Sequence, residues 1–186
     1  RSNFMGCDLK VVVQKLDHLT ELGANAIYLT PIFEASSNHK YDTIDYTRID
    51  PHFGDESTLV ELVQQAHRRG IRIMLDGVFN HCGFYFRQFQ DVLRHGEASP
   101  YKDWFHIHSF PVTLDPPNFD GFGIGPGMPK LNTQNPEVKE YLLGAVAKWT
   151  RTGIDGWRLD VSDEVDSDFW RDFRRTVKDI NPEAVI

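Results

Sequence analysis

The sequence predicts an α/β fold built on one parallel sheet, and two observations carry that prediction. Gly23, Gly70 and Gly153 each end an amphipathic segment, and each is followed at once by a short apolar run. Glycine at such positions is typical of helix ends, where the chain turns left-handed. Continuous apolar runs, as opposed to alternating ones, are typical of strands buried on both faces of a parallel sheet. We therefore expect consecutive helix–strand units in a single sheet.

Each expected element has a local signal. Asp8 and Asp55 precede the first two amphipathic segments and are expected to cap those helices. Apolar residues three and four positions apart define the helical faces, and Pro182 follows the last one. Residues 184–186 read as the start of a further strand. The expected helices are 8–22, 55–69, 135–152 and 167–180, and the expected strands are 25–30, 71–75 and 154–159.

The spacing of the glycines reveals an insertion. Gly23 and Gly70 are 47 residues apart, whereas Gly70 and Gly153 are 83 apart. The extra residues are rich in aromatic residues, glycine and proline, and show few helical or strand periods. We expect a first sheet segment at 1–81, an inserted subdomain at 82–134 after the second strand, and a second sheet segment at 135–186. The aromatic rings of the inserted subdomain suit either stacking on sugars or a small core of the subdomain.

Composition excludes several classes of protein. The chain of 186 residues has 20 Lys+Arg against 27 Asp+Glu and no basic run, so no nucleic-acid partner is expected. No apolar segment is long enough to span a membrane. Cys7 and Cys82 are too few for a disulfide framework and are read as reduced thiols. These thiols, and the lack of a leader before Arg1, favour a cytoplasmic protein.

The third expected strand ends on two charged residues. Arg158 and Asp160 alternate along the chain and therefore project to the same side. An arginine beside a partly buried carboxylate keeps that carboxylate ionised, as a nucleophilic or charge-stabilising Asp requires. A structural ion pair inside a barrel explains the same spacing equally well. The two interpretations stay open on these residues alone.

Other polar residues follow the first two strands. Asp76, Asn80 and His81 come directly after the second, and are either site residues or loop-orienting ones. His39 and Tyr41 suit a sugar platform, because a phenol ring stacks on a pyranose face and an imidazole bonds a hydroxyl; a polar rim loop is the alternative. No pair of residues has the spacing of a zinc site. We expect no cofactor, with Ca²⁺ at Asn80 left open.

Four short motifs resemble one known family. They are Asp-Gly-Val-Phe-Asn-His at 76–81, Met-Pro-Lys-Leu-Asn at 128–132, Gly-Trp-Arg-Leu-Asp-Val at 156–161 and Asn-His-Lys-Tyr-Asp-Thr at 38–43. The first three resemble motifs of the α-amylase family (glycoside hydrolase family 13), in the family's order. The second and fourth resemble the branch of neopullulanases, cyclomaltodextrinases and maltogenic amylases. The resemblance covers the chain from about residue 6 to residue 186.

The resemblance implies a partial TIM (β/α)₈ barrel, with barrel strands 2 to 4 and the start of 5, and a domain B inserted after barrel strand 3. It implies that Asp160 is the nucleophile of a retaining glycosidase and that Arg158 supports it. His39, Tyr41 and His81 would bind the sugar next to the cleaved bond.

The resemblance also assigns supporting roles. Asp76 and Asn80 match residues that support the site, and Asn80 matches a Ca²⁺ ligand of many α-amylases. Glu164 matches an acceptor-side substrate-binding residue of the neopullulanase branch. Asp163 stands where that branch often has Asn.

The implied function is cleavage of α-1,4 or α-1,6 glucosidic bonds in cyclodextrins, pullulan, maltooligosaccharides or starch, by hydrolysis or transfer, through a covalent glucosyl–Asp160 intermediate. The family's acid/base Glu lies on the next strand, which this chain only begins, so we expect the isolated chain to be inactive. A homodimer is implied for the full-length protein. A non-catalytic relative that binds carbohydrate or acts as a scaffold is the alternative. An unrelated barrel enzyme such as an aldolase would need a Lys or a phosphate loop at a strand end, and neither is present.

Overall fold

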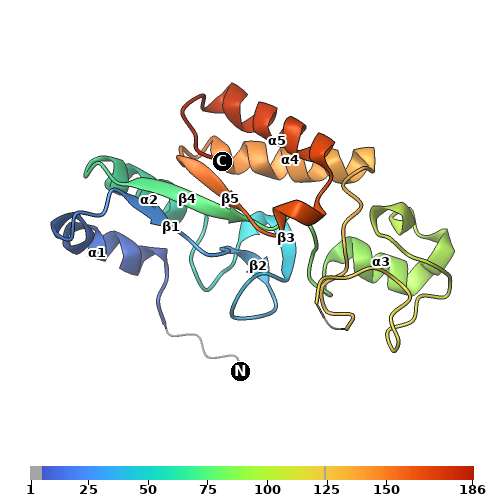
Figure 1. Cartoon of the computed structure of the whole chain (residues 1–186). Helices are drawn as coiled ribbons and strands as arrows, with labels where there is room; N and C mark the ends of the chain where they lie inside the picture. The colour runs from blue at the N-terminus through green and yellow to red at the C-terminus, as the bar shows by residue number, and fades with distance from the viewer. Residues whose placement is uncertain (1–5, 124) are drawn as a thin grey trace.

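The fold is organised by a three-stranded parallel sheet, as the sequence predicts. A computed structural model of the chain describes residues 6–123 and 125–186. The strands β1 (Ala26–Tyr28), β4 (Arg72–Gly77) and β5 (Gly156–Leu159) lie in the order β1-β4-β5 (Figure 1). Val185 bridges Gly156 in parallel, so a further strand begins beside β5.

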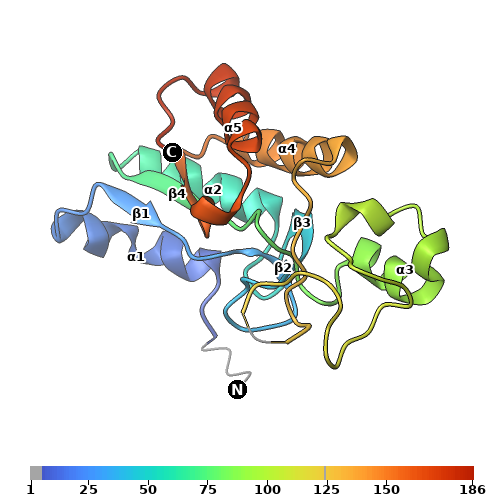
Figure 2. The ribbon, with the colours of Figure 1, turned by 45° about the vertical axis from the view of Figure 1, so that its right-hand side comes forward.

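Four helices accompany the sheet, close to the expected ranges. They are α1 (Leu9–Glu21), α2 (Glu56–His67), α4 (Pro136–Thr150) and α5 (Ser167–Ile180). Both Asp caps are confirmed, because Asp8 accepts a hydrogen bond from the Val11 amide and Asp55 forms a capping box with Thr58. Gly23 has a φ of +80° beyond α1, the left-handed ending that its position predicts. Figure 2 shows α1 beside α2, and α4 beside α5.

One face of the sheet is covered and the other is only partly covered. Ile73 and Leu75 of β4 are fully buried and share one core with residues of α2, α4 and α5. On the opposite face, Tyr28 is 44% exposed and the Arg158 side chain 45% exposed. The expectation of strands buried on both faces is therefore wrong for this chain. Burial alternates from Arg72 to Leu75, as the pleat of a strand with one solvated face predicts, whereas Asp76 and Gly77 at the end of β4 are both buried.

Two elements of the fold were not expected. An antiparallel hairpin pairs β2 (Phe33–Ala35) with β3 (Thr43–Ile49) around a loop at 36–42. A helix, α3 (Arg87–His95), lies within the insertion, where Phe89 and Val92 are buried three positions apart. Three 3₁₀ turns complete the described elements: η1 (Gly96–Ala98), η2 (Lys102–Trp104) and η3 (Ser162–Glu164).

The insertion has an aromatic core of its own that continues into the rest of the chain. The ring centroids of Phe89 lie 5.0 Å from both Phe105 and Phe119. Phe86 joins this cluster to Tyr141 of α4, at 5.9 Å. The insertion's buried rings are therefore core residues, which favours the second of the two interpretations of its aromatic content. Figures 1 and 2 show the segment beside one end of the sheet.

The insertion is anchored where β4 ends. An antiparallel bridge pairs His81 with Lys130, and the Cys82 amide donates to the Pro129 carbonyl at 3.1 Å.

Cys7 is exposed and Cys82 is buried, and both are free thiols. Within the described residues, no helix combines the length and apolar character needed to cross a bilayer.

A glycine marks the tightest backbone approach near this junction. Gly83 donates to the Thr43 carbonyl at 2.7 Å, and a Cβ at Gly83 would lie 2.2 Å from the Asp42 carbonyl oxygen. We expect Gly83→Ala to lower the free energy of unfolding by about 1–3 kcal/mol, because the backbone must move apart. Urea denaturation followed by circular dichroism measures this.

Gly144→Ala is the matched control. Gly144 lies exposed within α4, and a Cβ there meets nothing within 4 Å. Alanine should therefore stabilise the helix by about 0.5–1 kcal/mol. Equal stabilities of the two variants would contradict the close packing at Gly83.

Candidate active site

The centre of the site is one guanidinium shared by two carboxylates. The sheet register places Asp76 directly opposite Arg158. Arg158 Nη1 lies 3.1 Å from Asp76 Oδ1 and 2.6 Å from Asp160 Oδ1. The Asp160 amide continues the strand ladder by donating to the Gly77 carbonyl at 3.0 Å. Val161 follows with a φ of +48°, a strained conformation for a β-branched residue. The expected pairing of Arg158 and Asp160 is thus present, with Asp76 as an additional partner.

The two carboxylates differ in accessibility. The Asp76 side chain is 0% exposed, whereas that of Asp160 is 13% exposed. Asp160 lines a cleft of about 340 Å³ together with His39, Tyr41, Phe122 and Met128. A ligand in that cleft can therefore reach Asp160, and Asp76 acts behind it on the guanidinium.

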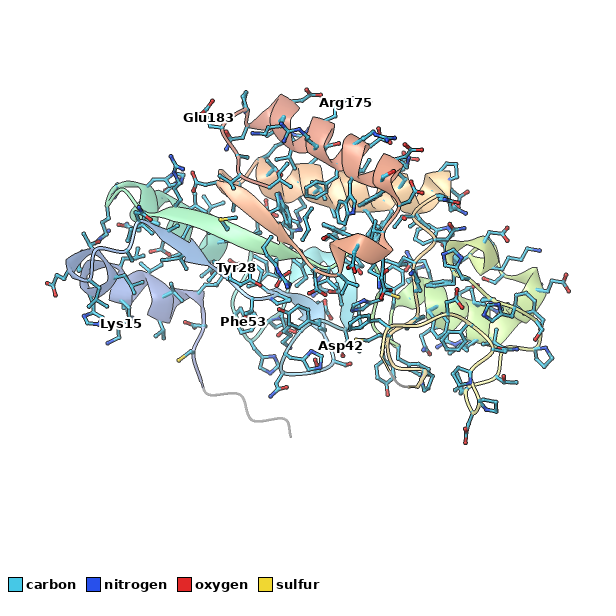
Figure 3. All side chains as sticks on the ribbon, viewed as in Figure 1. Lys15, Tyr28, Asp42, Phe53, Arg175 and Glu183 are labelled. Carbon is cyan, nitrogen blue, oxygen red and sulfur yellow. The ribbon has the colours of Figure 1, made fainter. Side chains whose placement is uncertain are left out.

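Two tyrosines hold Asp76 in place. The hydroxyls of Tyr28 and Tyr41 both donate to Asp76 Oδ2, the second at 3.0 Å. Burial raises the pKa of Asp76, while hydrogen bonds from Tyr28, Arg158 and Tyr41 lower it in part. Burial also raises the pKa of both tyrosines, so their hydroxyls remain protonated donors. Tyr28 lies on β1 near the middle of the view in Figure 3.

His81 is buried against an aromatic ring of the insertion. It is 0% exposed, and its ring stacks on Phe122 with centroids 4.8 Å apart. Burial lowers the pKa of His81, and nearby Asp160 opposes that effect. Within the described residues, His81 Nε2 has no hydrogen-bond partner. A buried ring nitrogen of this kind is a group that a ligand hydroxyl can satisfy.

The loop between β2 and β3 brings in the two expected platform residues. His39 is exposed, and its Nδ1 accepts from the Tyr41 amide at 3.1 Å. The two rings are stacked, with centroids 6.0 Å apart. Both line the cleft that contains Asp160. The loop therefore presents an imidazole and a phenol side by side to a ligand.

A second cavity of about 340 Å³ holds the remaining predicted residues. Glu164 Oε2 accepts from Asn80 Nδ2 at 3.3 Å and from Lys130 Nζ at 3.2 Å, and all three line that cavity with Asp163. Asn80 Nδ2 also lies 3.4 Å from the Nδ1 of His81. Asn80 of this cavity therefore contacts His81, whose ring stacks on Phe122 of the first cleft.

Three residues of the site were not predicted. Tyr28 carries a polar group at the end of an expected strand, which is the one signal for it in the sequence. Lys130 lies within the motif at 128–132, which indicates the family but carries no local signal for a ligand-binding lysine. Phe122 sits among many aromatic residues, most of which are core, so nothing local distinguishes it.

The lowered pKa of His81 has a consequence for stability. The unfolded state takes up a proton near pH 6.5, above the pKa of His81 in the folded state. Stability from this group is thus present above pH 6.5 and declines as the pH falls through the folded pKa, by at most about 1.4 kcal/mol per pH unit. Urea denaturation between pH 7.5 and 5 should show a shallower decline for His81→Gln.

His18→Gln serves as the control, because His18 is exposed on α1. This variant should keep the decline of the unmodified chain. Identical pH profiles for the unmodified chain and His81→Gln would contradict the burial of a neutral His81.

Comparisons with known proteins identify the family of the chain. The family model "Alpha amylase, catalytic domain" matches residues 2–182. The chain is 58% identical over 187 residues to the cyclomaltodextrinase of Geobacillus thermopakistaniensis (strain MAS1), covering 100% of this chain and 32% of that protein. It is 57% identical over 186 residues to neopullulanase 2 of Thermoactinomyces vulgaris, covering 99% and 32%. The chain thus spans about a third of the length of these curated relatives.

Solved structures give the same result. A cyclomaltodextrinase superposes with a TM-score of 0.96 at 58% identity, over 100% of this chain and 32% of that one. The cyclic α-maltosyl-(1→6)-maltose hydrolase of Arthrobacter globiformis, in complex with its cyclic sugar, gives 0.95 at 45% identity, over 100% and 42%. The family resemblance in the sequence is thereby confirmed. The chain belongs to the α-amylase family and matches part of that family's catalytic domain.

Proposed function

We propose that the full-length protein containing this chain is a retaining α-glucan hydrolase or transglycosylase with Asp160 as its nucleophile. The observation that carries the proposal is the Arg158 guanidinium, which pairs with the accessible Asp160 and the buried Asp76. The similar proteins include cyclomaltodextrinases and a neopullulanase, which supports cyclodextrins, pullulan, maltooligosaccharides or starch as substrates.

In this mechanism Asp160 attacks the anomeric carbon, and a covalent glucosyl–Asp160 intermediate forms as the leaving oxygen departs. Water then yields hydrolysis, or a second sugar yields transfer. Arg158 stabilises the Asp160 carboxylate before attack and after release. Asp76 fixes the guanidinium, because its own carboxylate is held by Tyr28 and Tyr41.

The mechanism needs a second carboxyl group, roughly 5 Å from the first, as general acid/base. Asp76 cannot supply it, because its side chain is 0% exposed and cannot reach a leaving oxygen. The family resemblance places the acid/base Glu at the end of the next strand, beyond these 186 residues. We therefore propose that these residues do not turn over substrate alone.

The sugar-binding roles follow from the two cavities. His39 and Tyr41 line the cleft that contains Asp160 and bind the sugar next to the cleaved bond. The family resemblance assigns His81 to the same sugar; its ring lies behind Phe122 of that cleft, and its Nε2 has no partner among the described residues. Glu164 binds the acceptor side from the neighbouring cavity.

We assign β1, β4 and β5 to barrel strands 2, 3 and 4, and Val185 to the start of strand 5. Residues 1–81 and 135–186 are then barrel segments, and 82–134 are domain B. The parallel order of the strands and the position of the insertion after β4 support this assignment.

The residues around Asn80 do not fit a calcium ion. Asn80 Oδ1 is buried and has no hydrogen-bond partner among the residues that the structure describes, which suits a hard cation. However, the Lys130 ammonium lies 3.2 Å from Glu164, the neighbouring carboxylate, and would repel a cation there. The described residues also hold no group of three or more His, Cys, Asp or Glu placed to bind a metal. We propose that activity needs no metal at this position.

Location and assembly complete the proposal. An intracellular location is supported by the name of one relative, the intracellular maltogenic amylase of Bacillus subtilis (strain 168), 58% identical over 186 residues. The homodimer remains a prediction.

Substitution of the nucleophile tests the function. We expect Asp160→Asn in the full-length protein to lower hydrolysis of β-cyclodextrin, pullulan and soluble starch by about 10³-fold or more, because an amide cannot attack the anomeric carbon. Release of reducing sugar measures the rate on each substrate, and the preferred substrate identifies the branch.

Asp179→Asn is the matched control, since Asp179 is exposed on α5, and it should retain full activity. The isolated 186-residue chain, assayed in parallel, should be inactive. A full-length protein inert on all three glucans would refute the proposal and favour a carbohydrate-binding or scaffold role. Turnover by the isolated chain would refute the external acid/base.

A further inference from the structure

A buried lysine lies between two residues that face the cleft. Lys40 is 1% exposed, although its neighbour His39 is exposed and Tyr41 is half-buried. Its backbone has a φ of +63°, and among non-glycine residues in the described ranges only Val161 shares a positive φ. Burying a charged side chain is unfavourable, and so is a positive φ at a non-glycine residue. Lys40 can therefore stay in this position only if its surroundings hold it there.

The surroundings of the Lys40 ammonium are specific. Nζ lies 2.6 Å from Asp50 Oδ2 and 3.3 Å from the Ala35 carbonyl oxygen, and 5.8 Å from the centroid of the Phe53 ring. The two paired side chains are 2% and 3% exposed. The lysine therefore runs from the loop at 36–42 into the base of the β2–β3 hairpin.

Asp50 is itself fixed to both ends of that hairpin. Its carboxylate accepts from the amides of Ala35, at 3.3 Å, and His52, at 3.0 Å, and lies 2.7 Å from His52 Nδ1. Its own amide donates to the Ile32 carbonyl at 2.9 Å. Lys40 is thus tied to a carboxylate that cannot shift without disturbing the hairpin.

A second carboxylate joins the two ends of the loop at 36–42 to each other. Asp42, labelled in Figure 3, accepts from the hydroxyls of Ser36 and Ser37 and from the Ser37 amide at 3.1 Å. The Lys40 amide donates to Ser37 Oγ at 3.1 Å. The loop ends are therefore held independently of the Lys40 side chain, which anchors only the middle, where His39 and Tyr41 project.

We propose that Lys40 is a positioning residue: its buried ion pair with Asp50 holds the left-handed turn that presents His39 and Tyr41 to the cleft. A buried ion pair contributes little net stability, since desolvation offsets attraction, but it strongly disfavours arrangements in which either charge is left alone. Removing Lys40 therefore frees the turn. The effect on sugar turnover rests on the proposed function, whereas the order of the loop does not.

The first experiment measures the loop directly. In the full-length protein, Lys40→Met should accelerate hydrogen–deuterium exchange of peptides covering 36–42 by about tenfold or more, because local opening becomes easier. Lys139→Met is the matched control: Lys139 pairs with Asp172 at 2.8 Å between α4 and α5, away from the loop. It should leave exchange of the loop unchanged.

The second experiment separates positioning from general stability. Lys40→Met should lower kcat/KM on a maltooligosaccharide by about 10- to 100-fold at a temperature where the variant is fully folded. Tyr41→Ala should then cost far less in the Lys40→Met background than in the wild type, because the ring is already misplaced. Lys139→Met should retain the wild-type kcat/KM.

Each outcome decides the matter. Unchanged exchange of the loop in Lys40→Met, or additive effects of the two substitutions, would overturn the proposal. If Lys40→Met fails to fold, the double variant Lys40→Met/Asp50→Asn, which leaves no buried charge unpaired, replaces it with the same expectations. A wild-type protein without glucan hydrolysis would refute the proposed function, and loop exchange would still decide the role of Lys40.

Discussion

The site depends on one constraint: Arg158 must satisfy two carboxylates at once. Asp76 is fully enclosed, and a buried charge without a partner is strongly unfavourable, so the guanidinium is required there. The register of β4 and β5 places the two side chains opposite each other, which makes the contact a property of the sheet. Asp160, two residues after Arg158, pairs with the same guanidinium at 2.6 Å.

Around this centre, each neighbouring segment contributes one kind of group. Tyr28 comes from β1, Tyr41 from the β2–β3 loop, and His81 from the end of β4. The insertion adds Phe122, whose ring stacks on His81. The arrangement places charged groups beside aromatic and imidazole rings, which suits the proposed carbohydrate ligand, since sugars present both hydroxyls and apolar faces. It also explains why so much of the site lies on connections, held by the strands beneath them.

Much of the fold could be predicted because its signals are local. Asp8, Asp55 and Gly23 specify helix ends within a few residues of themselves, and the structure confirms all three. The pairing of Arg158 with Asp160 was likewise visible, because strand alternation puts both on one side. The roles of the site residues remain predictions, whereas the structure places these residues together at one end of the sheet.

What could not be predicted depends on contacts between distant segments. The β2–β3 hairpin could not be predicted, because the three residues of β2 are too few to show an alternating pattern of apolar and polar residues. Its pairing with β3 is also irregular in register. Tyr28 and Asp76 are 48 residues apart, so their contact has no signature in spacing. Lys40 shows the same limit, because a charged residue between two polar ones reads as a loop surface until its partner Asp50 is seen.

The proposed mechanism requires Asp160 to bond to the sugar, with Arg158 and Asp76 behind it. The most direct measurement is to treat the full-length protein with a fluorine-deactivated α-glucosyl fluoride, whose fluoride leaves without protonation, and to locate the trapped sugar by peptide mass spectrometry. We expect the trapped sugar on Asp160. A label on Asp76, Asp163 or Glu164 would contradict Asp160 as the nucleophile. Glucan hydrolysis by the Asp160→Asn variant at the wild-type rate would contradict it as well.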